Sequence, residues 1–397
     1  MRNSFTVAGD DLAAAVHYAA HWLTTRPTIP AHGGLLFEVD GDRLNIFGFN
    51  ENATARATVE IDASDEPKGG FVVAGRLADA LTSALPKGPV RFEQDGPHVN
   101  VIAGRSRYAM PVMSESDYPG LPGAATLVGH VDGDDLADAV HRVAIAAKRD
   151  AEKEIVYCGI HVQLDRDDDL DVDDPECAYT LTLTATDRYR GAKQTIRWVP
   201  EDEAPIGGSF HVLASILGEA VEAFAGSEVA LGMDGGAVSL TSPTRSLVVS
   251  TLDQRGYPAE GLTAILATEP PERLTVSGKD LIEPLRRIGL FIQRPEAAGA
   301  IKVLPLQVDL AEDLMTLIAP LNSKGGGDEE VTVEYAGPPT SLILNAAYLQ
   351  AMLQSAPSDA VTLALYPGKL KPIIVSSPEH PTWRHLLQPL KSLGGNS

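Results

Sequence analysis

The side chains most able to bind an ion gather in one acidic segment, DRDDDLDVDDPE, at residues 165–176. Acids stand at positions 1, 3, 5, 9 and 12 of a twelve-residue frame, as they do in the calcium-binding loop of an EF-hand. Position six is Leu170 rather than the glycine that the EF-hand turn needs, and the flanks CGIHVQL and CAYTLTLTATD favour strands over helices. The segment indicates an acidic loop between two strands, with calcium binding as the minor alternative.

Two further pairs have spacings that chemistry could use. His17 and His21 are one helical turn apart, which can suit a metal, but no glutamate stands between them and no third ligand is evident. Cys158 and His161 could form a thiol nucleophile and its base, yet residues three apart in an extended strand point to opposite faces. Buried structural roles are therefore predicted for Cys158 and His161, and no metal site is predicted.

The short motifs of common enzymes give no support for catalysis. The sequence contains no GxxxxGK[ST] phosphate loop, no GxSxG elbow and no HExxH helix. We predict a protein that is not an enzyme and has no catalytic residues, cofactor or metal.

Composition limits the class of protein. The chain has 397 residues, enough for two or three domains, and no apolar stretch approaches the roughly 20 residues that cross a bilayer. The beginning, MRNSFTVAGDD, turns acidic where a signal peptide is apolar, and the two cysteines, Cys158 and Cys177, are too few for a disulfide scaffold. These features predict a cytoplasmic protein with free thiols and no membrane partner.

Net charge raises an objection to nucleic-acid binding. The chain has 32 Lys plus Arg against 54 Asp plus Glu, a formal charge of -22, which disfavours wrapping a polyanion if the charge is spread evenly. The placement of the basic residues therefore decides the question.

An internal repeat sets the architecture. The segments VAGDDLAAAVHYAAHWL, VDGDDLADAVHRVAIAA and VSGKDLIEPLRRIGLFI begin at Val7, Val131 and Val276, and each predicts a strand end, a glycine turn and an amphipathic helix. A second strand-to-helix segment begins at Phe71, Gly208 and Ser341. Alternating stretches at residues 35–49 and 229–243 predict hairpins between these helices.

These patterns predict an α+β fold of three similar domains, each a doubled motif of two helices backed by antiparallel sheets. Glycine and proline cluster at residues 118–125 and 257–272, where linkers are expected. The predicted domains span residues 1–122, 125–258 and 268–397.

Four ordered signatures carry a resemblance to a known family. They are RPTIPAHGGLLFEV from Arg26, GRSRYAMPVMSESDYPGLP from Gly104, TATDRYRGAK from Thr184 and HLLQPLKSL from His385. The chain resembles the bacterial beta sliding clamps, the DNA polymerase III beta subunits. The resemblance implies a half ring of three domains, closed head to tail by a second copy, that encircles double-stranded DNA of any sequence. It therefore also implies a nucleoid-associated location.

The geometry of such a ring follows from helix packing. Twelve helices side by side at about 10 Å give a circumference of roughly 120 Å, which leaves a hole of about 28 Å after one helix diameter is subtracted. A duplex passes through such a hole without being gripped. The family's partners are the DNA polymerase III alpha subunit, other polymerases and ligase, bound through short peptides, and a clamp loader that opens the ring with ATP.

Basic residues on the predicted helices answer the objection from net charge. The first helices of the second and third domains are expected to carry Arg142, Lys148, Arg149, Lys279, Arg286, Arg287 and Arg294 opposite apolar residues. The first domain adds His17, His21, Arg26, Arg76 and Lys87. The resemblance places Arg26, Arg76, Lys148 and Arg149 at or beside DNA contacts. The alternative is a solvated helix face.

The resemblance also implies a pocket for client peptides between the second and third domains. Its residues would be Thr186, Arg188, Arg190, Gly191, Pro258, Thr263, Leu386, Gln388, Pro389 and Leu390. Gly191 stands where the family usually has leucine, and Gln388 where it usually has an apolar residue. We expect part of the pocket floor to be missing, so that a family-type peptide binds at least about tenfold more tightly to a Gly191→Leu, Gln388→Met variant. These departures, with the tail KSLGGNS, favour as an alternative a divergent paralogue with altered clients.

Ring closure is assigned by resemblance to a strand around Arg107 and Tyr108 that meets a helix around Leu290 and Phe291 of the second copy. The alternative for these apolar residues is an intradomain core.

Three classes of function remain: a clamp on DNA, a clamp-shaped scaffold that has lost DNA binding, and an enzyme that uses the acidic loop or Cys158.

Removal of residues 167–174 is expected to leave folding and clamp activity intact, because acidic loops of this composition are solvated and tolerate changes of length. Thermal unfolding with and without calcium checks this prediction. A calcium-dependent rise in Tm that disappears on deletion would show an ion site instead.

Overall fold

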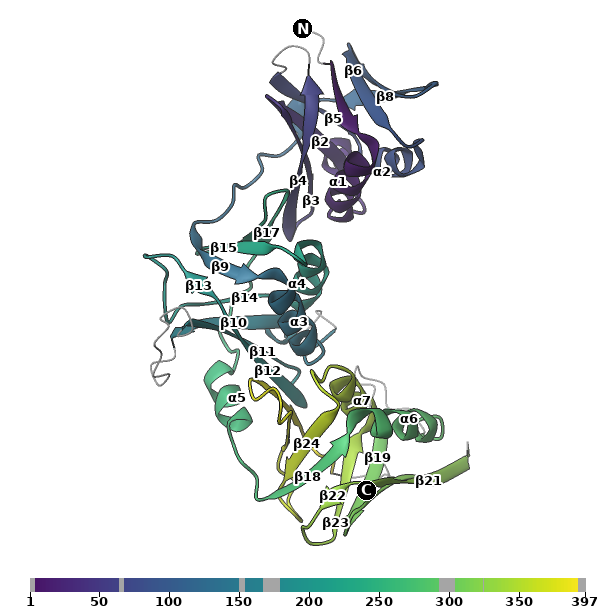
Figure 1. Ribbon diagram of the computed structural model, residues 1–397, viewed down its shortest axis with the longest axis vertical. Coiled ribbons are helices and arrows are strands. Elements are labelled where there is room, and N and C mark those ends of the chain that lie inside the picture. The colour runs from purple at the N-terminus through teal and green to yellow at the C-terminus, as the bar shows by residue number, and fades with distance from the viewer. Residues whose placement is uncertain are drawn as a thin grey trace. The chain divides into compact units, whose positions relative to one another are not determined.

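The computed structural model describes most of the chain (Figure 1), and the described residues gather into two compact units. Unit 1 contains residues 1–134, 199–204 and 219–251, and unit 2 contains the remainder. The segment 167–176, Cys177 and Arg294 lie outside the described residues. The described ranges are 4–63, 68–149, 154–166, 179–292, 304–323 and 325–391.

All six predicted strand-to-helix segments are present. The first set is β1 (Ser4–Ala8) with α1 (Gly9–His21), β9 (Leu127–Asp132) with α3 (Gly133–Ala144), and β18 (Glu272–Ser277) with α6 (Gly278–Ile288). The second set is β5 (Lys68–Ala74) with α2 (Gly75–Ala84), β14 (Ser209–Leu213) with α4 (Ala214–Val221), and β23 (Thr340–Asn345) with α7 (Ala346–Gln354). Among the described residues, no helix combines the length and apolar character needed to span a membrane.

A seventh α-helix, α5 (Ala259–Leu266), lies in a segment that the sequence predicts to be a linker. Its sequence, AEGLTAIL, follows Pro258 and contains a glycine, so the local signals for a helix are weak. Leu262 and Leu266 are buried, which indicates that tertiary packing stabilises this helix.

Among its described residues, unit 1 contains one antiparallel sheet of 13 strands in the order β1-β6-β7-β8-β5-β2-β3-β4-β17-β16-β15-β9-β13. The predicted hairpins at residues 35–49 and 229–243 are confirmed as β2–β3 and β15–β16. The remaining strands are β2 (Gly34–Asp40), β3 (Arg43–Phe49), β4 (Ala53–Ala63), β6 (Pro89–Asp95), β7 (His98–Ala103), β8 (Ser106–Met113), β13 (Val199–Pro200), β15 (Glu228–Asp234), β16 (Ala237–Thr241) and β17 (Arg245–Ser250).

The described part of unit 2 contains a nine-stranded sheet in the order β14-β10-β11-β12-β26-β25-β24-β18-β22 and a four-stranded sheet in the order β21-β20-β19-β23. The strands expected to flank the acidic segment are confirmed as β10 and β11. The strands are β10 (Gly159–Arg166), β11 (Tyr179–Thr186), β12 (Arg190–Arg197), β19 (Pro305–Ala311), β20 (Leu314–Asn322), β21 (Gly325–Thr332), β22 (Glu334–Tyr335), β24 (Ala360–Leu365), β25 (Ile373–Ser376) and β26 (Trp383–Leu387).

The internal repeat of the sequence is also a repeat of strand order. The run β5-β2-β3-β4 has the same connectivity as β14-β10-β11-β12 and β23-β19-β20-β21. The run β8-β7-β6-β1 likewise matches β17-β16-β15-β9 and β26-β25-β24-β18. The predicted α+β fold of repeated, doubled motifs is confirmed, whereas the exact domain bounds stay a prediction.

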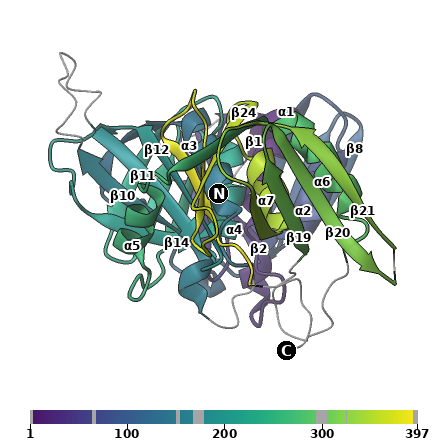
Figure 2. The same ribbon diagram turned by 90° about the horizontal axis from the view of Figure 1, so that it is seen from below.

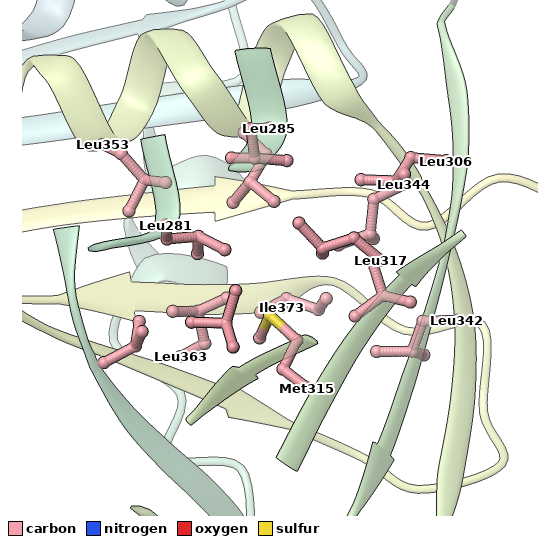
Figure 3. Close-up of a cluster of buried hydrophobic side chains, with 14 of the residues drawn as sticks. Leu281, Leu285, Leu306, Met315, Leu317, Leu342, Leu344, Leu353, Leu363 and Ile373 are labelled. Atoms are coloured by element: carbon pink, nitrogen blue, oxygen red, sulfur yellow. The ribbon is translucent and has the colours of Figure 1, made fainter. Parts of the chain in front are cut away.

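One side of α6 is embedded in the core of unit 2. Leu281, Leu285 and Ile288 are spaced for one helix face and are almost fully buried. In Figure 3, Leu281 and Leu285 lie among leucines of the surrounding strands and of α7. Burial of each such side chain stabilises the fold by about 1.5 to 3 kcal/mol, and it turns Arg286 and Arg287 to the exposed face of the helix.

Three histidines are buried in the nine-stranded sheet. Burial lowers the pKa of His385 in β26 to about 3, and the nearby Arg190 guanidinium adds to the effect. Burial also lowers the pKa of His161 in β10 to about 4, assisted by the neighbouring His211. The pKa of His211 is lowered by burial as well. The folded protein therefore keeps these rings neutral at pH values where an exposed histidine is charged.

The free energy of unfolding should fall as pH drops below about 6.5 towards about 4, because the unfolded chain then binds protons that the buried histidines do not. Each such histidine contributes a slope of up to about 1.4 kcal/mol per pH unit. Urea unfolding across this range measures the slope. The His385→Gln variant should have a shallower slope, while His98→Gln at an exposed position should not; equal slopes for all three proteins would contradict the prediction.

Candidate functional site

The predicted client residues begin at a tight turn between β11 and β12. The Thr186 hydroxyl donates to the Arg190 carbonyl at 2.6 Å and accepts from the Arg188 amide at 3.0 Å. Arg188 has a φ of 77°, a left-handed conformation that is uncommon outside glycine. The Arg190 guanidinium holds the Asp187 carboxylate at 3.0 Å across the turn. These contacts fix the turn and therefore the direction of both arginines.

Both arginines of the turn also lie on aromatic rings. Arg190 stands 4.0 Å from the ring centroid of Tyr348 on α7, a cation–π distance. Burial raises the pKa of Tyr348 to about 12, which keeps its hydroxyl protonated. Arg188 lies over Tyr157 at 5.3 Å and pairs with Glu154 at 2.9 Å. An aromatic ring and a carboxylate thus hold each of the two guanidinium groups in place.

The helix α5 packs against the strands on either side of the β11–β12 turn. It contacts β11, β12 and β26 and lies beside β11 and β12 (Figure 1, Figure 2). Leu262, Leu266 and Leu386 form a buried cluster there. A Cβ atom added to Gly191 would lie 2.6 Å from Cδ1 of Leu262 and 3.2 Å from Cδ2 of Leu386. The expectation that the floor is missing at Gly191 is therefore wrong: Leu262 of α5 fills that space.

Gln388 follows β26 and has hydrogen-bond partners. Its Nε2 donates to the Leu370 carbonyl at 3.1 Å, and its backbone amide donates to the Tyr189 carbonyl at 2.8 Å. Tyr189 and Leu370 have 39% and 55% of their surface exposed, respectively, so apolar surface flanks the glutamine. A partnered amide adds no unsatisfied polar group to this surface.

The structure brings the predicted client residues into one neighbourhood of unit 2. Gly191 pairs directly with Leu386 across β12 and β26, and the Leu390 amide donates to the Ile343 carbonyl at 2.7 Å. Thr263 lies on α5, and Pro258 is the residue immediately before the first residue of this helix. Thr186, Arg188 and Arg190 lie at the β11–β12 turn, while Gln388, Pro389 and Leu390 continue from β26.

The exposed face of α6 carries basic residues, but they are paired with acids. Arg286 lies 3.0 Å from Glu283, and Arg287 lies 2.6 Å from Glu329 on β21. The hydrogen bond to Glu329 raises the pKa of Arg287. Lys279 is also exposed, at the beginning of α6.

The basic residues predicted on the helix at residue 133 are distributed differently. The helix α3 ends at Ala144, so Lys148 and Arg149 lie beyond it, and the expectation that this helix carries them is wrong. Arg142 does lie on α3 and pairs with Asp138 one turn earlier. Lys148 pairs with Glu154 at 3.1 Å.

In unit 1 the corresponding helices carry fewer basic residues. Arg26 and Arg76 are exposed, and Arg76 lies at the beginning of α2. The rings of His17 and His21 lie within hydrogen-bond distance of Asp79 (3.1 Å) and Glu219 (3.0 Å), respectively. Among the described residues, no group of three His, Cys, Asp or Glu side chains is arranged to hold a metal.

The residues predicted to close the ring are exposed within the chain. Tyr108 on β8 is 42% exposed. Leu290 and Phe291, which were predicted on a helix, lie just beyond the end of α6 instead and are 70% and 38% exposed. An intradomain core role for these apolar side chains is therefore excluded. Arg107 lies 3.8 Å from Glu93 on the neighbouring part of the sheet.

Cys158 and His161 are both buried, as predicted. Cys158 belongs to a short 3-10 helix, η3 (Ile155–Cys158), rather than to a strand, which corrects the expectation that both residues lie in one strand. The His161 ring stacks on Tyr257 with centroids 5.3 Å apart.

Comparison with known proteins agrees with this fold. Residues 3–122 match the model of the DNA polymerase III beta subunit, N-terminal domain. The beta sliding clamp of Micrococcus luteus is 32% identical over 330 residues, covering 82% of this chain and 98% of that protein. The beta sliding clamp of Streptomyces coelicolor is 26% identical over 407 residues, covering 98% of this chain and 99% of that protein.

The same family appears among solved structures. A sliding clamp from Pseudomonas aeruginosa bound to griselimycin superposes with a TM-score of 0.85 at 18% identity, over 99% of this chain and 100% of that one. The chain belongs to the beta sliding clamp family. The resemblance inferred from four signatures is confirmed, and the coarse role of this family, a clamp on DNA, applies to the chain.

Some residues of the site carried no local signal in the sequence. Leu262 fills the space at Gly191 from a segment that resembles a linker, and Tyr348 supports Arg190 from a helix far along the chain. The sequence shows Gly191 but gives no sign that the buried Leu262 lies beside it.

Replacement of Gly191 with leucine is expected to destabilise this clamp by about 1 to 3 kcal/mol, because the new side chain meets Leu262 in a filled space. Affinity for a family-type peptide should not rise. Urea unfolding measures the first effect and fluorescence anisotropy the second.

The matched control is a double-mutant cycle with Leu262→Ala. The Gly191→Leu, Leu262→Ala variant should recover part of the stability lost by either single variant, since the added side chain then has room. A Gly191→Leu protein as stable as the parent would contradict this account.

Proposed function

We propose that this chain is a ring-forming processivity factor that encircles duplex DNA and tethers polymerases to it. The threefold repeat of strand order, together with full-length similarity to beta sliding clamps, carries this proposal. The three repeats are proposed as domains spanning residues 1–122, 125–258 and 268–397. The clamp itself would hydrolyse nothing, and an ATP-using loader would open it.

Ring closure follows from extending the repeat by one step. Two equivalent strand pairs join successive copies of the motif, β4 with β17 and β12 with β26. The third copy ends in β21, which is the last strand of its sheet among the described residues. The equivalent of β17 and β26 is β8, which pairs with β7 along Ser106–Pro111 and with β5 only at Val112 and Met113.

We infer that β21 of one copy pairs with β8 of a second copy, head to tail. The exposed Tyr108, Leu290 and Phe291 would become buried at this contact, which supports a homodimer with two equivalent interfaces. Arg107 would lie beside the same contact.

DNA contact is proposed for eight basic residues of the two units, of which Arg142 and Lys148 are half-buried and the other six are exposed. Lysine and arginine contacts to phosphate carry no sequence information, which suits a ring that moves along any duplex. Exposed ion pairs contribute only about 0 to 1 kcal/mol, so the acids beside these cations can be exchanged for phosphates at low cost. The proposed contacts are Arg26, Arg76, Arg142, Lys148, Arg149, Lys279, Arg286 and Arg287.

Client peptides of the DNA polymerase III alpha subunit, the clamp loader, other polymerases and ligase are proposed to bind at the β11–β12 turn and the end of β26. The anchored Arg188 and Arg190, with apolar Tyr189 and Leu370 at the surface, support this assignment. The polar Gln388, which stands where the family usually has an apolar residue, supports a second candidate, a divergent clamp with altered clients; Gly191 does not, because Leu262 fills the space beside it.

Loading onto nicked circular DNA, followed by linearisation, tests the clamp proposal. The protein should stay on the circle and leave after the circle is cut, because topology rather than affinity retains it. Equal loss from circular and linear DNA would indicate a clamp-shaped scaffold. Turnover that depends on a metal or a thiol would indicate an enzyme instead.

Combined replacement of Lys148, Arg286 and Arg287 with alanine should weaken binding to all duplex sequences alike. The dependence of log affinity on log salt should become shallower by about one unit for each phosphate contact that is lost. Fluorescence anisotropy over a salt series measures both effects. An unchanged slope would show that these residues do not face DNA.

The opposite change provides the matched control. The Glu283→Gln, Glu329→Gln variant frees Arg286 and Arg287 from their acids and should bind DNA more tightly, with a slope at least as steep as that of the parent. Weaker binding by this variant would show that the acids orient the arginines rather than compete with DNA.

A further inference from the structure

A pocket of about 490 Å³ lies in unit 1 between the sheet and the segment that follows Tyr118. We name it the linker pocket. Its floor is a row of side chains directly opposite one another on four strands, Leu36, Phe47, Arg56 and Ser246. The neighbouring floor residues are Thr54 and Val248, its cover is the segment 118–124, and Glu38 and Glu115 lie at its rim.

Arg56 lies in the middle of this floor with an unused donor. Its Nε atom is buried and has no hydrogen-bond partner among the described residues. A buried donor of this kind is unfavourable until an acceptor oxygen reaches it. Nε itself has almost no accessible surface, but Arg56 is only half-buried and lines the pocket, so a carbonyl group that enters can accept from its guanidinium group.

The rest of the pocket indicates what carries that carbonyl. Leu36 and Phe47 on the floor and Leu121 in the cover present partly exposed apolar surface, which suits an aliphatic side chain. The two exposed glutamates at the rim outnumber the single arginine of the floor, so a cation at the rim would be favoured and a phosphate there disfavoured. An extended peptide combines these three groups at short spacing.

The repeat of strand order relates the linker pocket to the proposed client site. Thr54 and Val248 face each other on β4 and β17 as Gly191 and Leu386 do on β12 and β26. The segment after Tyr257 forms the helix α5, whose Leu262 fills that space, whereas the segment after Tyr118 forms no helix through residue 124. The first copy thus keeps open a space that the second copy fills.

We propose that the linker pocket binds a short extended peptide segment of a partner protein, in which one aliphatic residue is flanked by Lys or Arg. The aliphatic side chain packs on Phe47 and Leu121, a peptide carbonyl accepts from the guanidinium group of Arg56, and the basic residues meet Glu38 and Glu115. This site is separate from the β11–β12 turn, so the proposal does not depend on client binding there.

The probe is a fluorescein-labelled heptapeptide with one leucine between two lysines in a glycine and alanine background. The matched probe carries glutamate in place of both lysines. Fluorescence anisotropy with the full chain should show saturable binding of the lysine probe and at least about tenfold weaker binding of the glutamate probe.

Three variants test where the lysine probe binds. The Glu38→Lys, Glu115→Lys variant should weaken binding at least about tenfold, and Thr54→Trp, which fills the pocket, should abolish it. The Asp202→Lys, Glu203→Lys variant changes net charge equally at exposed positions of the same unit and should bind like the parent. If Thr54→Trp fails to fold, the pair of charge variants decides.

Several results would overturn the proposal. One is no saturable binding of the lysine probe at concentrations up to about 1 mM. Another is equal binding by all variants, or loss of binding in Gln388→Trp rather than in the variants of the linker pocket. If a second copy of the chain occupies the pocket instead, the Glu38→Lys, Glu115→Lys variant would change the mass of the oligomer in solution, and its affinity for the lysine probe would equal that of the parent.

Discussion

The pairing of strands from successive copies of the repeated motif is the interaction on which the rest of the structure depends. A strand with one open edge presents unpaired amides and carbonyls, and such edges are satisfied by another strand or left to associate. In this chain β4 is completed by β17 and β12 by β26. Each of these junctions also brings together side chains from distant segments, and both the proposed client site and the linker pocket lie on one.

A second constraint is the conflict between an acidic chain and a polyanionic partner. The net charge of the chain is -22, and the acids extend to the helices that carry the basic residues. Arg142, Arg286 and Arg287 are each paired with a carboxylate there. Local basic character therefore depends on which carboxylates remain in place when a phosphate approaches. A count of basic residues along a helix overstates the positive potential of its face.

Much of the fold was predictable from the sequence, since the glycine turn and amphipathic helix recur with the same residue types and the hairpins alternate with a period of two. The helix α5 was not, because the sequence AEGLTAIL has weak local signals and its stability comes from contacts with β12 and β26. The space at Gly191 was misjudged for the same reason: its occupant, Leu262, comes from that unpredicted helix. Pairings such as Arg287 with Glu329 join residues that are distant in the sequence, so they required coordinates.

The paired cations of α6 have a consequence for motion along DNA. In the ring that we propose, Arg286 or Arg287 leaves one phosphate, pairs again with Glu283 or Glu329, and then meets the next phosphate. The guanidinium group therefore keeps a counter-charge between steps. Because exposed pairs of either kind differ by no more than about 1 kcal/mol, the free energy varies little with the position of the duplex. Acids that lower the affinity of the inner face would then also lower its friction, and one-dimensional diffusion would be faster than on a face of bare arginines.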